Sequence, residues 1–214
     1  MIRALRIVKR SALKARTQAM NQIHALLSTA PEDLRARLRR HQGKTLVGVL
    51  SRSRCEVPTS PLEATKLALR ELARRHQHLA GEIDRMEAEL SRLVGQVAPE
   101  LLALKGVGID VAGQLLVTAG DNPDRLRNEA AFAHLCGVAP IPASSGKTVR
   151  HRLNRGGDRQ ANSALYRVVM VRMRWDERTK AYVARRTQEG RSTKEIMRCL
   201  KRYVAREVYQ LLRA

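Results

Sequence analysis

Apolar residues recur at helical spacing along most of this chain. Residues 1–28 and 191–212 each carry an apolar stripe, and residues 32–50 match two short helices. Prolines and small polar residues over 51–61 interrupt the pattern and predict a loop. Segments with strand character, such as LLVTAG and TVRHRL, are too short to establish a sheet. The pattern therefore predicts an all-α, mainly helical fold.

The clearest periodic signal lies in residues 59–98. Apolar positions alternate there by three and four residues for about four heptads, which predicts a long coiled-coil arm. Ser60 or Thr59 can cap this helix, with Glu63 placed for a capping box. The seam can pack within the chain or against a second copy, and we expect a homo-oligomer through the arm. The seam positions are Leu69, Leu72, His76, Leu79, Ile83, Met86, Leu90, Leu93 and Val97.

These boundaries divide the chain into three parts. Residues 1–58 form a basic helical segment, residues 59–98 form the arm, and residues 99–214 form a helical C-terminal domain. In the C-terminal domain, Trp175 is interpreted as a packing anchor and Cys199 as a core residue of the last helix.

The charge of the chain narrows its possible partners. Lys and Arg number 41 against 20 Asp and Glu, which gives a net charge of +21. Nucleic acid is the commonest partner for such an excess, and no apolar run approaches the roughly 20 residues that a membrane span needs. Aromatic residues make up only 3% of the chain, so base stacking on single strands is not expected as a main binding mode. Three dispersed cysteines indicate neither a zinc site nor disulfides, and they fit a cytoplasmic location.

The sequence LLALKGVGIDVAGQLL (101–116) predicts two short helices joined by a tight turn at Gly106 and Gly108. Val107 can enter the core, while the free N–H groups that open the second helix can hold a phosphate, with charge added by Lys105. This pattern is similar to the helix-hairpin-helix of DNA-repair proteins. A plain helical hairpin without a ligand is the alternative.

A Ser-Gly basic segment covers residues 138–163. Arginine guanidinium groups fit phosphate oxygens, and a serine hydroxyl among them can attack a phosphodiester. His151 can belong to the basic patch or assist a serine, and Asp158 or Asn154 can cap the helix that follows. The alternative is a solvated basic loop. Including the hairpin above, the candidate nucleic-acid contacts are Lys105, Gly106, Gly108, Lys147, Arg150, His151, Arg152, Arg155, Arg159 and Asn162.

Two motifs together, LLALKGVGIDVAGQLL and GVAPIPASSGKTVRHRLNRGGDRQANSAL, resemble the C-terminal domain of the insertion-sequence-110/116/902 transposases. The resemblance implies a recombinase of mobile elements, bacterial or archaeal and associated with the nucleoid. It implies double-stranded DNA of the element ends and target, and a structured guide RNA, as partners. It places the serine nucleophile at Ser145, with Ser144 as the second choice, because this chain has one glycine after the serine where the family commonly has two.

The family also has an N-terminal acidic domain of RNase H-like fold, in which four carboxylates hold Mg²⁺. The first 30 residues here contain no Asp or Glu, and the acids elsewhere are scattered along helices. We therefore expect no metal site in this chain, which would be a truncated transposase that binds nucleic acid but lacks the metal-dependent step. Two other functions remain open: a binding module that regulates the full-length transposase, and an unrelated basic helical scaffold.

Overall fold

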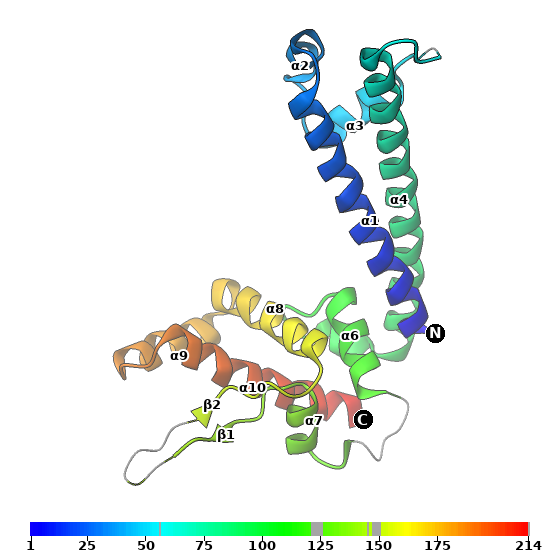
Figure 1. Ribbon diagram of the computed structural model, residues 1–214. Coiled ribbons are helices and arrows are strands. Elements are labelled where there is room, and N and C mark those ends of the chain that lie inside the picture. The colour runs from blue at the N-terminus through cyan, green and yellow to red at the C-terminus, as the bar shows by residue number, and fades with distance from the viewer. Residues whose placement is uncertain (56, 121–125, 145, 147–150, 214) are drawn as a thin grey trace. The chain divides into compact units, whose positions relative to one another are not determined.

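The computed structural model describes residues 1–55, 57–120, 126–144, 146 and 151–213. These residues are mainly helical and include one pair of two-residue strands, which confirms the predicted fold class (Figure 1). The chain divides into two compact units, and the division falls within one long helix. Unit 1 comprises Met1 and residues 3–89, and unit 2 comprises Ile2 and residues 90–214.

Unit 1 contains α1 (Ile2–Thr29), α2 (Glu32–Leu38), α3 (Gly43–Ser51) and most of α4 (Pro61–Val97). The helices α1 and α4 run side by side in opposite directions (Figure 1). Ile23 of α1, Leu46 of α3 and Leu69 of α4 are buried in one core. The apolar stripes on these helices therefore pack against each other within the chain.

The predicted capping box of α4 is present. Ser60 Oγ accepts a hydrogen bond from the Glu63 N–H at 3.3 Å, and the Glu63 carboxylate accepts from the N–H groups of Ser60 and Thr59. These bonds satisfy backbone donors that the first turn of a helix leaves unpaired. The start of α4 is thus fixed by local sequence.

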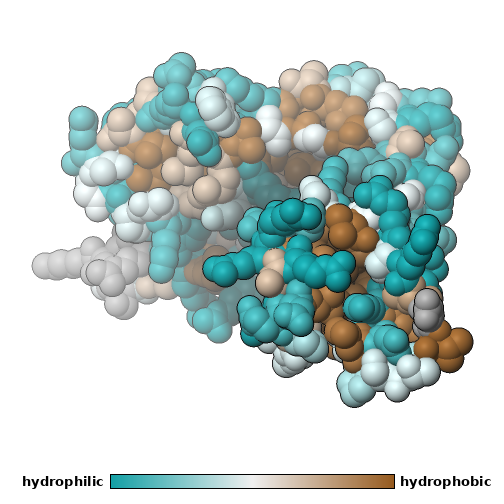
Figure 2. Space-filling view, turned by 90° about the horizontal axis from the view of Figure 1, so that it is seen from above, coloured by the Kyte–Doolittle hydropathy of each residue, from teal (hydrophilic) through white to brown (hydrophobic). Residues whose placement is uncertain are grey.

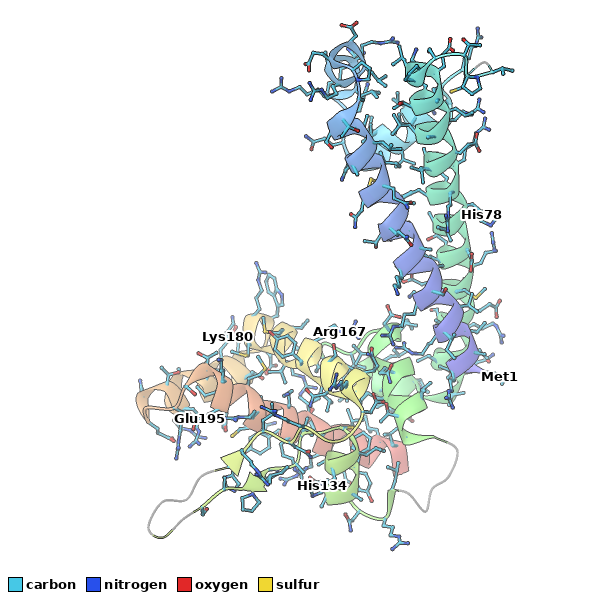
Figure 3. The ribbon with its side chains drawn as sticks, in the orientation of Figure 1. Met1, His78, His134, Arg167, Lys180 and Glu195 are labelled. Carbon is cyan, nitrogen blue, oxygen red and sulfur yellow. The ribbon has the colours of Figure 1, made fainter. Side chains whose placement is uncertain are left out.

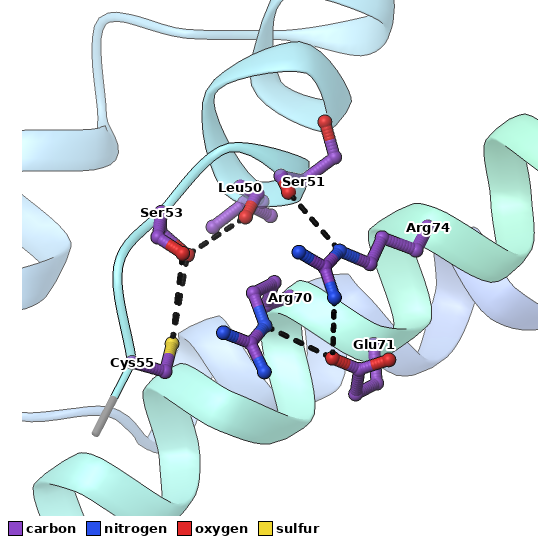
Figure 4. A network of polar contacts seen from close by, with 7 residues as sticks. All are labelled: Leu50, Ser51, Ser53, Cys55, Arg70, Glu71 and Arg74. Carbon is purple, nitrogen blue, oxygen red and sulfur yellow. Dashed lines mark hydrogen bonds and ion pairs between the residues drawn. The ribbon is translucent and has the colours of Figure 1, made fainter.

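The C-terminal end of α3 is held to α4 by an arginine. Arg74 Nε donates to the Ser51 carbonyl oxygen at 3.3 Å, and its guanidinium also pairs with Glu71 (Figure 4). A cation is favourable at a helix C-terminus because the last carbonyl groups have no partner within the helix.

The predicted seam on α4 faces α1 of the same chain over much of its length. Leu69 and Ile83 are buried, and Lys9 Nζ of α1 lies 3.4 Å from the Glu87 carboxylate of α4. Partial burial, together with the nearby charge of Arg16, lowers the pKa of His76. The antiparallel pair thus supplies an intramolecular partner, while oligomerisation through the arm stays a prediction.

Unit 2 is built around α8 (Arg159–Trp175), which packs against α6 (Ile109–Ala119) and α10 (Thr193–Arg213). The stripe Ile196, Leu200, Val204 and Val208 buries one face of α10. Three shorter helices complete the unit: α5 (Pro99–Ala103), α7 (Glu129–Leu135) and α9 (Glu177–Gln188). The strands β1 (Ile141–Pro142) and β2 (His151–Arg152) pair antiparallel in front of α10 (Figure 1).

Trp175 corrects one expectation from the sequence. Its side chain is 63% exposed at the end of α8, with the Arg174 guanidinium 5.2 Å from the ring centroid. It is therefore not a packing anchor. Exposed apolar residues such as Ile7 and Met170 are scattered in the same way, and Figure 2 shows hydrophobic patches separated by hydrophilic side chains.

Candidate nucleic-acid interface

Two glycines bring the ends of the Ser-Gly segment together. Gly157 has φ +84°, and a Cβ there would lie 2.6 Å from the backbone N of Gly137 and from the carbonyl oxygens of His134 and Leu135. Gly137 has φ +64°, and its Cβ would lie 2.6 Å from the Gly156 carbonyl oxygen. Only glycine allows two backbones to approach this closely in left-handed conformations. These contacts close the base of the hairpin whose two strands are β1 and β2.

Asp158 fixes this base to three helices. Its Oδ1 accepts from the Gln160 N–H at 2.7 Å, which confirms Asp158 as the cap of α8. Its Oδ2 accepts from Thr118 Oγ1 at 2.5 Å and from Gln114 Nε2 at 3.2 Å, both on α6. The Asp158 N–H donates to the Leu135 carbonyl of α7 at 2.7 Å. One residue thus ties the hairpin base to α6, α7 and α8.

Asn162 and Lys201 complete the base of the hairpin. The Asn162 amide donates to the carbonyl oxygens of Cys136 and Gly137 at 3.1 and 2.9 Å, and Asn162 Oδ1 accepts from Lys201 Nζ at 2.9 Å. Lys201 is 7% exposed, and burial together with the charge of Arg198 lowers its pKa. Asn162, expected from the sequence to contact nucleic acid, therefore has its polar atoms engaged inside the protein.

The hairpin itself carries most of the remaining candidates. Ser144 is exposed, whereas Ser145, Lys147 and Arg150 lie outside the described residues. Four basic residues are exposed: His151 and Arg152 on β2, Arg155 after it, and Arg159 at the start of α8. The structure thus places these four side chains next to the fixed base, at the surface, where they are accessible to a ligand.

A cleft of about 1060 Å³ lies between the hairpin base and the helices α9 and α10. It is strongly basic, and Glu195, at the start of α10 in Figure 3, is the acidic residue among those that line it. Its basic lining residues are His151, Arg152, Arg186, Arg191, Arg198, Lys201, Arg202 and Arg206. Such an excess of one sign favours binding of an anion.

Carboxylates neutralise only part of this charge. Glu129 of α7 pairs with both Arg202 and Arg206 of α10, the latter at 3.0 Å. Partial burial raises the pKa of Glu129, but hydrogen bonds and charge from the two arginines outweigh this, so its pKa is lowered. Among the described residues, no carboxylate lies within ion-pair distance of Arg198 or Lys201.

A turn joins α5 to α6, whereas phosphate binding by a helix-hairpin-helix at this turn stays a prediction. Val107 is 6% exposed and packs in the core, and Gly106 has φ +85°. Gly108 precedes α6 in an extended conformation with open space around it. Lys105 Nζ lies 3.7 Å from Asp176, and its carbonyl oxygen accepts from Arg172. The turn at Gly108 is therefore accessible to a ligand, although Asp176 offsets part of the positive charge of Lys105.

Sequence analysis missed the basic residues of α10. Arg198, Arg202 and Arg206 repeat every four residues, which places them on one face of the helix. The four-residue spacing of these arginines in the sequence could have predicted a basic face of α10. The sequence analysis used only the apolar stripe on the opposite face, which predicts that the helix packs on the core. Cys199, expected in the core, is only partly buried and lines the cleft.

The described residues contain no group of three or more His, Cys, Asp or Glu side chains that could hold a metal ion. The Mg²⁺ that the family resemblance implies therefore has no fitting set of ligands among them. None of the described helices combines the length and apolar character that a membrane crossing requires.

Comparison with known proteins finds a similarity in part of unit 2. Residues 98–184, which include the helical hairpin and the Ser-Gly segment, match the family described as Transposase IS116/IS110/IS902. The chain is also 29% identical over 131 residues to the insertion element IS110 uncharacterized 43.6 kDa protein of Streptomyces coelicolor. That alignment covers 60% of this chain and 32% of the relative, so the chain spans about a third of the protein it matches. Residues 98–184 are thus similar to the IS116/IS110/IS902 transposase family, and the similarity to the insertion element protein points the same way.

Proposed function

We propose that this chain handles DNA during transposition of an insertion element. The observation that carries the proposal is the hairpin of unit 2, whose base is fixed by Gly137, Gly157, Asp158 and Asn162 and lies beside a basic cleft. The fixed base holds His151 and Arg152 of β2 beside the cleft, and positioning of groups around a bound backbone is a major source of rate enhancement.

The proposed chemistry is attack of a serine hydroxyl on a DNA phosphodiester. The serine Oγ forms a bond to phosphorus while the bond from phosphorus to the leaving strand's oxygen breaks. The proton lost by the serine is taken up by a base or solvent, and the leaving oxygen is protonated to a hydroxyl. Arginines around the cleft stabilise the charge on the phosphate oxygens. We assign the nucleophile to Ser145, with Ser144 as the second choice.

The partners follow from the same proposal. The ligands are double-stranded DNA of the element ends and of the target, together with a structured guide RNA, and the protein acts as a homo-oligomer in the cytoplasm, associated with the nucleoid. The supporting observations are the net charge of +21 and the exposed basic residues of unit 2. A metal-dependent step would need carboxylates beyond those that the structure describes.

A covalent adduct tests the proposal directly. The purified chain is incubated with a labelled DNA substrate that carries an element end, with and without the element RNA, and is separated on a denaturing gel. We expect a protein–DNA adduct that is lost in Ser145→Ala, or in Ser144→Ala if the second choice is correct. Ser91→Ala changes an exposed serine of α4 and serves as the matched control.

The outcomes separate the alternatives left open by the sequence. An adduct that survives both hairpin substitutions would overturn the serine assignment. Tight, salt-sensitive binding without an adduct would mean that the chain is a binding module. Absence of any nucleic-acid binding would favour an unrelated scaffold.

A further inference from the structure

The cleft of unit 2 has two walls and a floor. One wall is the hairpin base from Gly137 to Pro140 with β2, and the other is the α9–α10 turn with the exposed face of α10. Lys201 lines the cleft although it is 7% exposed, so its ammonium group lies at the floor. A ligand that neutralises this group must enter the cleft.

The charge at the floor favours an anionic ligand. The hydrogen-bond partner of Lys201 is the neutral amide of Asn162, and Arg198 lies close enough to lower the pKa of Lys201. Glu195 offsets part of the Arg198 charge, and an anion in the cleft would offset the rest of the charge on the two cations. Arg152 and His151 face the same space from β2. Consecutive phosphates of one nucleic-acid strand would match this row of cations.

One aromatic ring lines the cleft beside these cations. Tyr203 is 46% exposed, although it is close to the apolar stripe of α10. Its ring packs edge-on against Tyr182, with 5.7 Å between centroids, which holds it in place. A fixed, exposed ring next to a positive groove is the arrangement with which proteins bind unpaired bases by stacking.

We propose that this cleft binds a single-stranded segment of nucleic acid. Its phosphates contact Arg198, Lys201 and Arg152, and one base stacks on Tyr203. The exposed ring favours an unpaired base, because the bases of a duplex are stacked on each other and their faces are not free to pack on Tyr203. This inference rests on the proposed function, in which a DNA strand is cut, and it adds a site made largely of residues beyond the matched segment 98–184. Sequence composition alone suggested that stacking plays little part, and the proposal revises that expectation at one residue.

Fluorescence anisotropy with the full chain tests the proposal. The probes are a labelled oligonucleotide of about ten nucleotides, within the usual site size, and the same sequence as a duplex. We expect Tyr203→Leu to weaken single-strand binding about tenfold, the scale of one stacked base, and duplex binding less than twofold. Arg198→Gln should also weaken single-strand binding and lower its logarithmic salt slope by about 0.7.

Two further variants complete the design. Arg85→Gln removes an exposed arginine of α4 in unit 1 and is the charge-matched control, which should leave both affinities within twofold of the unaltered chain. Lys201→Met removes the floor charge and should weaken strand binding, provided that circular dichroism shows a folded chain. Arg198→Gln and Tyr203→Leu alter more exposed side chains, so the test does not depend on the folding of the Lys201 variant.

The results distinguish this inference from the proposed function. Equal losses for strand and duplex, or no loss with Arg198→Gln and Tyr203→Leu, would overturn the cleft as a single-strand site, whatever the adduct assay shows. A selective loss of strand binding would support it even in a preparation that forms no serine adduct. Only a chain that binds neither probe would contradict both proposals.

Discussion

At the residue scale, the contact between Gly137 and Gly157 is the tightest constraint on the candidate site. Three backbone atoms lie 2.6 Å from the position of a Cβ on Gly157. They belong to α7 and the turn after it, which α10 holds through Glu129. Relief of the clash would therefore require two backbone segments to move apart.

We expect Gly157→Ala to lower the free energy of unfolding by about 3 kcal/mol, because strain at a positive φ adds to the backbone clash. Chemical denaturation monitored by circular dichroism measures this loss. Gly95→Ala is the matched control: its Cβ meets nothing within 4 Å in α4, and we expect it to raise stability by about 0.5–1 kcal/mol. A Gly157→Ala variant as stable as the unaltered chain would show that the hairpin base is not closed in solution.

Local features of individual residues could be predicted from the sequence. The capping box at Ser60 and Glu63, the cap at Asp158 and the burial of Val107 all depend on neighbours within a few positions. The pair of Asn162 and Lys201 could not be predicted, because 39 residues separate them and periodicity carries no information on tertiary pairing. The prediction that Trp175 packs in the core was wrong for the same reason, because the residue type alone does not determine which tertiary contacts a side chain makes.

At the element scale, α9 begins at a capping aspartate. The Asp176 carboxylate accepts hydrogen bonds from the side chain and the backbone of Thr179 at 2.6 and 2.9 Å. These bonds, together with the charges of Lys105 and Arg172, hold the pKa of Asp176 below its ordinary value of 3.8 against the opposing effect of burial. The ionised carboxylate is therefore more stable in the folded than in the unfolded chain.

We expect Asp176→Ala to cost about 1 kcal/mol of unfolding free energy at neutral pH, the usual value for a lost helix cap. Because the folded pKa is the lower one, this contribution is present above pH 3.8 and is lost as the pH falls through the folded value. Urea denaturation at several pH values measures the difference, with Asp84→Ala, at an exposed site in α4, as the control. A difference that persists undiminished in strong acid would exclude the ionised cap as its source.

Glu129 links α7 to α10 and restrains two cations of the cleft. Glu129→Gln would free Arg202 and Arg206, so we expect nucleic-acid affinity to rise severalfold at low salt while unfolding free energy falls by about 1 kcal/mol. Salt titrations of binding and denaturation curves measure the two effects. Glu100→Gln, at an exposed position of α5, changes the net charge equally. If both variants bind equally tightly, net charge rather than release of the two arginines sets the affinity.

Helix positions were the most predictable level of structure. The expected helix over 1–28 is α1 (Ile2–Thr29), and the expected C-terminal helix over 191–212 is α10 (Thr193–Arg213), because strong apolar periodicity and caps define both. The partner of the α4 seam was not predictable, since a heptad pattern is the same for intramolecular and intermolecular packing.

At the scale of the whole molecule, each unit has a hydrophobic core of its own, and a net charge of +21 is spread over both. Self-repulsion of this charge opposes the folded state when no partner is bound. We expect the melting temperature of the free chain to rise as ionic strength increases from roughly 0.01 to 0.1 M, where the screening length shortens from about 30 to about 10 Å.

Affinity for nucleic acid should fall over the same range, because salt competes with the phosphate contacts. Differential scanning fluorimetry and anisotropy titrations in matched buffers follow the two trends. A melting temperature that falls with added salt would mean that the ion pairs of the folded chain outweigh its self-repulsion.

The closed hairpin base has an evolutionary consequence. Among the described residues, the bonds that hold it join Leu135, Cys136 and Gly137 to Asp158 and Asn162, and the exposed Ser144 takes no part in them. Substitutions at Ser144 can therefore accumulate without loss of the scaffold. Under the proposed serine chemistry, folding and catalysis depend on different residues, so a copy of the element that has lost catalysis would still produce a folded chain.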